Sequence, residues 1–186
     1  VGFVTGCQMA NFTCLGAARH EVLRRSGWDV KKDGLQGAPR VTVIAGEEAH
    51  ATLLVALRML GLGTGNVISV PVDGQGRMVP DKAEEALETA SGPVILCLQA
   101  GNVNTGSFDP CARIIPAARA KGAWVHVDGA FGLWGRVLPS LDHHTRGIEL
   151  ADSWATDAHK WLNVPYDSGI AIVRNGAAHR ASMALN

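Results

Sequence analysis

Six short apolar runs rich in β-branched residues recur along the chain and constrain its fold more than any other feature. They cover residues 41–45, 67–70, 94–98, 123–127, 153–156 and 169–173. Their apolar residues are continuous rather than alternating with polar ones, which is typical of strands buried on both faces of a sheet. The runs therefore predict the strands of a mostly parallel sheet.

Segments with helical spacing lie between several of these runs. Residues 7–25 follow a glycine turn, residues 47–60 end at Gly61, residues 81–90 begin with an Asp81-x-x-Glu84 capping pattern, and Asp109-Pro110 open the next helix as cap and first turn. The alternation predicts an α/β fold with right-handed crossovers. Ligands of such folds bind at the carboxyl ends of the strands. We treat residues 1–186 as one domain, because no repeat or linker divides them.

The charge balance argues against a nucleic-acid or anionic-membrane partner. The chain has 17 acidic and 17 basic residues, so it carries no strong overall field. The four cysteines are scattered, with no metal or disulfide spacing, and no apolar run approaches the roughly 20 residues of a membrane helix. We expect a soluble, cytoplasmic protein without a signal peptide that acts on a small molecule.

A lysine follows one of the predicted strands in a polar turn. Residues 153–162 read SWATDAHKWL, which places His159 and Lys160 between two tryptophans. Apolar and aromatic surroundings disfavour an ammonium ion, and a neutral amine is what Schiff-base chemistry requires. The alternative is an exposed lysine beside a helix start, which is the commoner place for this residue type.

An aspartate ends a strongly apolar strand in the segment WVHVDGAFG, residues 124–132. Burying Asp128 there without a partner would cost several kcal/mol, so a positive group should meet it. A protonated pyridine nitrogen would serve, and aspartate is a standard partner of that nitrogen in enzymes that use pyridoxal 5'-phosphate (PLP) as an electron sink. The alternative role for Asp128 is a helix cap after the strand.

Two further segments carry weaker signals. The segment VTGCQMAN, residues 4–11, leads from a strand end through a glycine turn into a helix, whose free N–H groups and dipole suit a phosphate. Many α/β proteins begin a helix in this way. His50 lies at another strand-to-helix corner, where an imidazole can lie flat on an aromatic ligand. A lone histidine is more often structural or exposed.

Together these segments resemble the group II PLP-dependent decarboxylases, the family of the aromatic amino acid, glutamate and cysteine sulfinate decarboxylases. The resemblance runs from Thr5 to Arg174, and its most specific pieces are HVDGA at residues 126–130 and DAHKW at residues 157–161. It implies the large domain of the PLP-dependent transferase (type I) fold, also called the aspartate aminotransferase superfold, with helices on both faces of the sheet.

The resemblance also implies roles for individual residues. Lys160 would carry PLP as a Schiff base, Asp128 would pair with the pyridine nitrogen, and His50 would stack on the ring and approach the substrate carboxylate. These three are the expected catalytic residues. The expected cofactor-binding residues are Gly6, Cys7, Gln8, His50, Asn102, Asp128, Ala130, Asp157, His159 and Lys160.

Two segments depart from the family pattern. The phosphate turn, usually Gly-Gly-Ser, reads Gly6-Cys7-Gln8, so phosphate binding should depend more on backbone N–H groups. Val103 stands where a cofactor-contacting threonine is usual, and that contact is lost or passes to Asn102 or Asn104. No metal site is expected, because the pair His143 and His144 is more typical of a solvated loop than of a metal site.

The activity implied by the resemblance is decarboxylation of an L-amino acid to an amine and carbon dioxide, within amino acid and carboxylic acid metabolism. Transamination, carbon–carbon lysis, or a catalytically silent role in association are the alternatives. The chain opens on Val1 within an apolar stretch, so we expect it to be part of a longer polypeptide. The small domain, mobile loop, proton donor and substrate pocket should lie outside residues 1–186 or in the second subunit of a homodimer, and these residues alone should be inactive.

Overall fold

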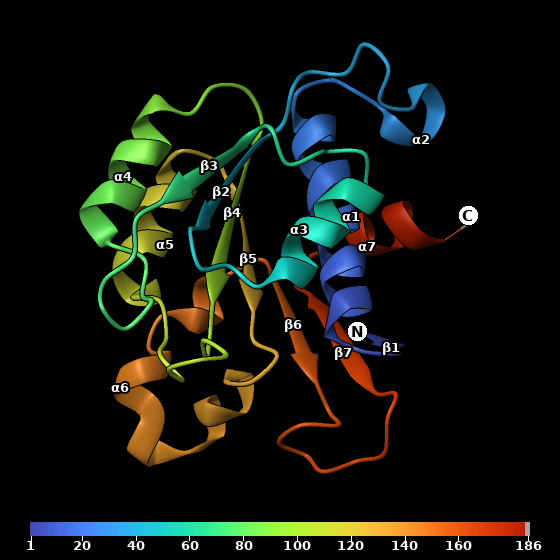
Figure 1. The fold of residues 1–186 in the computed structure, drawn as a ribbon. Coiled ribbons are helices and arrows are strands. Elements are labelled where there is room, and N and C mark those ends of the chain that lie inside the picture. Colours follow the sequence, from blue (N-terminus) through green and yellow to red (C-terminus); the bar gives the residue numbers. More distant parts are fainter. Residues whose placement is uncertain (185–186) are drawn as a thin grey trace.

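A seven-stranded sheet forms the centre of the computed structural model, which describes residues 1–184 (Figure 1). The strand order is β1-β7-β6-β5-β4-β2-β3. The strands are β1 (Gly2–Val4), β2 (Thr42–Gly46), β3 (Val67–Val70), β4 (Val94–Gln99), β5 (Trp124–Asp128), β6 (Ser153–Asp157) and β7 (Gly169–Val173). All six predicted strands are therefore confirmed, with ends that differ by at most one residue.

Most neighbouring strands run parallel. The strands β3, β2, β4, β5 and β6 pair in parallel, whereas β7 pairs antiparallel with both β6 and β1. The predicted mostly parallel sheet is confirmed. Because β7 reverses direction between its two neighbours, the carboxyl end of β1 lies at the same edge of the sheet as the carboxyl ends of the parallel strands.

Helices cover both faces of the sheet, as expected (Figure 1). On one face, α1 (Cys7–Arg25) packs against the strands and against α3 (Ala51–Met59) and α7 (Gly176–Met183), and on the other α4 (Pro80–Thr89) packs with α5 (Cys111–Ala120). The remaining short helices are α2 (Val30–Asp33), α6 (Asp142–Thr145) and the 3-10 segments Leu133–Val137, Pro139–Leu141 and Ile148–Leu150. Within residues 1–184, no helix combines the length and the apolar character needed to cross a bilayer.

Each face of the sheet has its own hydrophobic core. Alternate residues of β4 enter the two cores: Ile95 and Cys97 lie with α1, and Leu96 and Leu98 lie with α4 and α5. This arrangement explains the continuous apolar runs in the sequence, because both sides of each central strand must be apolar.

Three predicted helix starts are wrong in detail. The helix α4 begins at Pro80 with Val79 as N-cap, and Asp81 forms no capping hydrogen bond. The helix α3 begins at Ala51, because the chain turns between Gly46 and Ala49 and His50 serves as N-cap. Proline suits the first helical position, where its missing N–H would have no partner within the helix, so α4 begins at Pro80 and Asp81 lies inside its first turn.

Asp109 is the third case, because it caps no helix. Its carboxylate accepts backbone hydrogen bonds from Met78 and Gln99, both at 2.7 Å, and Pro110 takes the N-cap position of α5. Burial raises the pKa of Asp109 to about 6. The residue therefore ties together two segments that are distant in the sequence instead of starting a helix.

Candidate active site

The predicted site residues meet at the carboxyl edge of the sheet. Asp128 is the last residue of β5 and Asp157 the last of β6, while β1 leads through Gly6 into α1 and β2 leads to His50 before α3. Neighbouring parallel strands end side by side, so these four connections converge on one place. They surround a cavity of about 430 Å³, within the usual size range of small-molecule sites.

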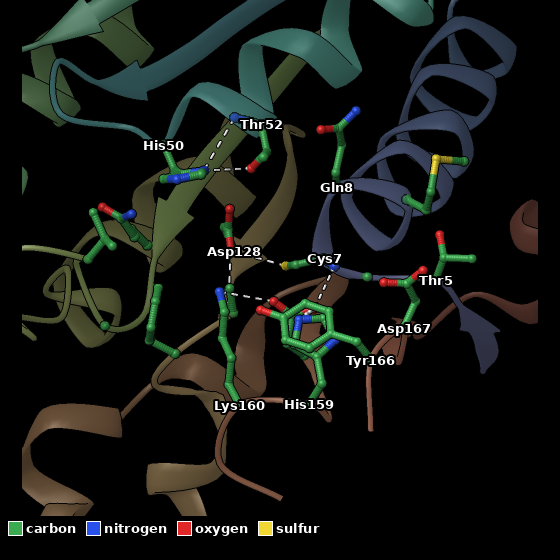
Figure 2. Close-up of a pocket in the computed structure, with 18 residues that line it drawn as sticks. Thr5, Cys7, Gln8, His50, Thr52, Asp128, His159, Lys160, Tyr166 and Asp167 are labelled. Carbon is green, nitrogen blue, oxygen red and sulfur yellow. Dashed lines mark hydrogen bonds and ion pairs between the residues drawn. The ribbon is translucent and has the colours of Figure 1, made fainter. Parts of the chain in front are cut away.

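Nine of the ten residues predicted to bind the cofactor line this cavity. They are Gly6, Cys7, Gln8, His50, Asp128, Ala130, Asp157, His159 and Lys160 (Figure 2). Figure 2 shows Asp128 near the middle of the view, with His50 above it and Lys160 extending toward it from below. The structure therefore brings the three predicted catalytic residues to one cavity.

Lys160 lies in the loop after β6 and is held by two neighbours. Its Nζ lies 3.0 Å from Oδ2 of Asp157 and 3.7 Å from the centroid of the Phe131 ring. The side chain is one quarter exposed. The expected aromatic neighbour is thus Phe131, whereas Trp161 is about half exposed. The expected apolar surroundings are only partly present, because the amine also pairs with a carboxylate.

Asp157 connects three parts of the site. Besides the ion pair with Lys160, its Oδ1 accepts a 2.6 Å hydrogen bond from the backbone N–H of Cys7 and lies 3.6 Å from Nε2 of His159. The Nδ1 of His159 accepts from the backbone N–H of Ser168, and its ring stacks on Tyr166 with centroids 3.9 Å apart. The start of α1 is therefore tied to the loop that carries Lys160.

Asp128 is buried and surrounded by hydrogen-bond donors. Its Oδ1 accepts from the backbone N–H of Ala130 at 3.1 Å and from Sγ of Cys7 at 3.5 Å, and its Oδ2 accepts from Nδ2 of Asn11 at 2.9 Å. In residues 1–184 no cationic side chain forms an ion pair with it. The hydrogen bond from Ala130 is a local turn of the kind expected if Asp128 only capped the segment after the strand. The carboxylate also lines the cavity, however.

Cys7 contributes a thiol as well as a backbone N–H. Burial and then the negative charge of Asp128 raise the pKa of this thiol well above its ordinary value. The thiol is therefore protonated at neutral pH and serves as a donor to Asp128.

The first turn of α1 forms one wall of the cavity. Cys7, Gln8 and Met9 line it, together with Thr5 and Gly6 before the helix. Gly6 is the N-cap and offers no side-chain cap, and the N–H of Cys7 donates to Asp157, so the N–H groups of Gln8 and Met9 are the ones left without a capping side chain. The side chain of Gln8 is exposed and makes only a 4.0 Å contact with the sulfur of Met59. This wall has the polarity of an anion site.

The position of His50 is set by α3. Its Nδ1 accepts from the backbone N–H of Thr52 at 3.3 Å and lies 2.8 Å from the hydroxyl of Thr52, and the residue is exposed. Thr52 also lines the cavity. Capping therefore holds the imidazole at the rim of the cavity.

Asn102 is the one predicted cofactor residue that does not line the cavity. Its Oδ1 accepts from the backbone N–H groups of Asn104 and Thr105, and its Nδ2 lies 3.4 Å from Oε2 of Glu48. Gly101 and Val103 line the cavity in its place. The amide is occupied in closing its own loop, so the structure does not favour a cofactor contact there.

Several lining residues were not among those predicted from the sequence to bind the cofactor. They are Thr5, Met9, Thr52, Gln99, Gly101, Val103, Phe131, Tyr166 and Asp167. Phe131 directly follows the HVDGA segment at residues 126–130, so its place in the sequence could have indicated that it lies near the site. Tyr166, the single tyrosine of the chain, reaches the site only through the loop after Lys160 and its stacking on His159.

Comparisons with known proteins agree with this geometry. The sequence model of a protein family described as "Pyridoxal-dependent decarboxylase conserved domain" matches residues 2–186. The chain belongs to this family. The family membership confirms the resemblance, the α/β fold and the PLP cofactor expected from the sequence.

Individual relatives show how much of a whole enzyme the chain represents. It is 34% identical to the acidic amino acid decarboxylase GADL1 of Bos taurus over 86% of the chain and 31% of that protein. It is 32% identical to tryptophan decarboxylase 1 of Oryza sativa over 95% of the chain and 34% of that protein. The chain spans about a third of the length of these relatives.

A solved structure has the same fold. The crystal structure of Oryza sativa TDC with PLP and tryptamine aligns with a TM-score of 0.86 at 30% identity, over 100% of this chain and 38% of that one.

The cavity suits PLP in three respects. An acceptor-only carboxylate without a cationic partner, Asp128, faces it, as a protonated ring nitrogen requires. The N–H groups of α1 that follow Cys7 would suit the phosphate, and Lys160 would offer an amine for covalent attachment. The donor set in residues 1–184 therefore fits the cofactor of the family.

Proposed function

We propose that this chain provides the cofactor site of an enzyme that decarboxylates an L-amino acid to an amine and carbon dioxide. The observation that carries the proposal is that Lys160 and Asp128, at the ends of the neighbouring strands β6 and β5, line one cavity. Family membership supports the reaction class, since the family is one of pyridoxal-dependent decarboxylases.

Each residue has a distinct role in this proposal. Bound PLP supplies an electron sink for the pair of electrons left when carbon dioxide departs. Lys160 attaches the cofactor through its amine, and Asp128 keeps a proton on the ring nitrogen, which stabilises the charge that develops in the transition state. The negative charge of Asp157 orients the amine of Lys160 at 3.0 Å.

The remaining residues bind and orient the cofactor. His50 would lie over one ring face and Ala130 against the other, while His159 borders Lys160 and is fixed by its stacking on Tyr166. Gly6, Cys7 and Gln8 would hold the phosphate, chiefly through the N–H groups of the first turn of α1 that Asp157 does not take, because the thiol of Cys7 is a weak donor and the side chain of Gln8 is exposed.

The relatives act on different amino acids. Their names state acidic amino acids in one case and tryptophan in another. We propose only that the substrate is an L-amino acid. Lys160 and Asp128 would act on the cofactor rather than on the substrate side chain.

The products of the reaction test the proposal. The full-length protein, loaded with PLP, is incubated with a panel of L-amino acids, and carbon dioxide, amine and keto acid are quantified. We expect carbon dioxide and amine in equal amounts, with keto acid only as a trace. Stoichiometric keto acid formed with an amino-group acceptor would instead identify an aminotransferase, and the absence of turnover on every amino acid would refute an enzymatic role.

We further propose a homodimer located in the cytoplasm. Large apolar side chains on the loop after Lys160 are exposed, among them Trp161, Leu162 and Tyr166, and a second subunit would cover them. All four cysteines are free and buried, which fits a reducing compartment. Light scattering of the purified protein and fractionation of cells test the two statements. A monomer at micromolar concentration or a secreted protein would contradict them.

A further inference from the structure

A chain of four hydrogen bonds runs through the protein interior and ends at Asp128. Nε1 of Trp124 donates to Oγ of Ser153 at 2.9 Å, and this Oγ lies 2.9 Å from Nδ1 of His126. Nε2 of His126 lies 2.8 Å from Oδ1 of Asn11, and Nδ2 of Asn11 donates to Oδ2 of Asp128 at 2.9 Å. None of the first four residues lines the cavity.

The direction of the chain follows from its two ends. The indole of Trp124 can only donate, so Ser153 accepts this bond and has its own proton left for Nδ1 of His126. At the other end, the carboxylate of Asp128 can only accept, so Asn11 must turn its NH₂ group toward it. The carbonyl oxygen of Asn11 then faces His126.

His126 completes the chain as a neutral imidazole of one tautomer. Burial lowers the pKa of His126 to about 4, so the ring is neutral at physiological pH. Because the Asn11 oxygen can only accept, the single ring proton lies on Nε2, and Nδ1 is left to accept from Ser153. Each group in this hydrogen-bond chain therefore has a single assignment as donor or acceptor at each of its bonds.

Burial makes this arrangement hard to change. Asn11, His126 and Ser153 are fully buried, and Trp124 is 1% exposed. Leaving a buried polar group without a hydrogen-bond partner costs more free energy than an ordinary hydrogen bond contributes. Reversing the donor and the acceptor of one bond would therefore disturb all four bonds. The hydrogen-bond chain also joins α1, β5 and β6, three of the elements that frame the cavity.

We propose that Asn11, His126 and Ser153 are positioning residues that hold Asp128 as a carboxylate aimed at the ring nitrogen of the cofactor. The inference rests on the proposed function, since it assigns a purpose to the contact between Asp128 and PLP. These residues touch neither cofactor nor substrate, and they act through the orientation and charge of Asp128.

The experiment compares the binding of two ligands to the full-length protein. One is PLP, and the other is the analogue in which a carbon atom replaces the ring nitrogen. Both share the aldehyde and the phosphate, so effects on those contacts cancel in the ratio of dissociation constants. The variants are Ser153→Ala and Asn11→Asp, and the control is Thr145→Val, which removes a buried hydroxyl bonded to the carbonyl oxygens of Leu141 and Asp142.

We expect Asn11→Asp to weaken PLP binding about tenfold or more, because it removes a hydrogen bond to the charged Asp128. Ser153→Ala removes the donor to Nδ1 of His126 and should weaken PLP binding in the same direction, while binding of the analogue changes less than about twofold in both variants. Thr145→Val should leave the ratio at the wild-type value. If the variants weaken the binding of both ligands equally, or of neither, the hydrogen-bond chain serves folding alone and the proposal is overturned.

Two further observations separate the possible failures. If the wild-type protein does not prefer PLP to the analogue, the pairing of Asp128 with the ring nitrogen is itself wrong, and the inference falls with that part of the proposed function. If neither variant folds, ¹⁵N NMR of the histidines in the wild-type protein decides the matter without substitution. A proton on Nε2 of His126 supports the proposal, and a proton on Nδ1 overturns it.

Discussion

Asp157 joins Lys160 to the beginning of α1. One oxygen of its carboxylate pairs with Nζ of the lysine at 3.0 Å, and the other accepts the N–H of Cys7 at 2.6 Å. The same side chain therefore orients the group proposed to carry the cofactor and anchors the helix start proposed to hold its phosphate. Displacing this carboxylate should affect both ends of the cofactor.

Asp157→Asn should lower the free energy of unfolding by about 1 to 3 kcal/mol. The amide removes the negative charge opposite Lys160, and its NH₂ group must face either Nζ of Lys160 or the N–H of Cys7, both of which are donors. Urea denaturation measures the change. The matched control is Asp142→Asn, which breaks an exposed pair with Arg136 and should change stability by less than about 1 kcal/mol. Equal effects of the two substitutions would contradict a special role for Asp157.

Lys160→Ala should abolish the visible absorption of the protonated Schiff base while noncovalent cofactor binding remains. The lysine is the amine that lines the cavity, so covalent attachment needs it. Borohydride reduction of the wild-type protein followed by peptide mapping locates the attachment site. A label on Lys121, which contacts the carbonyl oxygen of Glu88 away from the cavity, would disprove the assignment.

Asp128→Asn should permit attachment of the cofactor and yet reduce turnover of the full-length enzyme. A neutral amide cannot hold the proton on the ring nitrogen, and loss of a charge-assisted partner costs about 2 to 5 kcal/mol, or about thirtyfold to several thousandfold in rate. If the new NH₂ group took the place of Oδ2, it would face the NH₂ group of Asn11, and two donors cannot form a hydrogen bond with each other. Steady-state kinetics provide the test, and turnover within about threefold of wild type would leave Asp128 a purely structural role.

Gly169→Ala should destabilise the protein by about 1 to 3 kcal/mol and weaken PLP binding, because a Cβ there would lie 2.5 Å from the backbone carbonyl carbon of Gly6. The turn before α1 would have to move away from β7. Gly74→Ala is the control, since an added Cβ meets nothing within 4 Å. Thermal unfolding and PLP titration are the measurements, and similar values for both variants would refute the close approach.

His126 should make stability depend on pH between about 6.5 and 4. Its pKa is lowered by burial from about 6.5 to about 4, so the unfolded chain binds a proton in this range that the folded protein does not. The stabilisation is fully present above pH 6.5 and is lost as the pH falls through 4.

This term amounts to about 3 kcal/mol over the whole range. His126→Gln removes it, so the difference in unfolding free energy between wild type and variant should shrink as the pH falls from 7 to 4. Denaturation at several pH values measures this difference. A constant difference would mean that His126 titrates normally in the folded protein.

The sequence by itself determined the layers of the fold, and it predicted site residues that the structure brings to one cavity. Strands β3 and β7 have the predicted bounds, because burial on both faces leaves a continuous apolar signal in a short local segment. Asp128 and Lys160 could be predicted as site residues because Asp128 ends such a strand and Lys160 lies three residues after another. The predicted helix starts at Asp81 and Asp109 were wrong. A local capping pattern does not show that Pro80 starts the helix one residue earlier, or that Asp109 accepts from the distant N–H of Met78.

Only the tertiary structure decided how the site residues are held. Asn11 meets Asp128 across 117 positions of sequence, and Cys7 meets Asp157 across 150. Asn102 carried a plausible local signal, yet its amide closes its own loop. Local patterns record which face of an element is buried, but a hydrogen bond between distant elements depends on how the sheet brings them together. For this reason Lys160 and Asp128 could be read from the sequence, whereas the chain through Asn11, His126 and Ser153 could not.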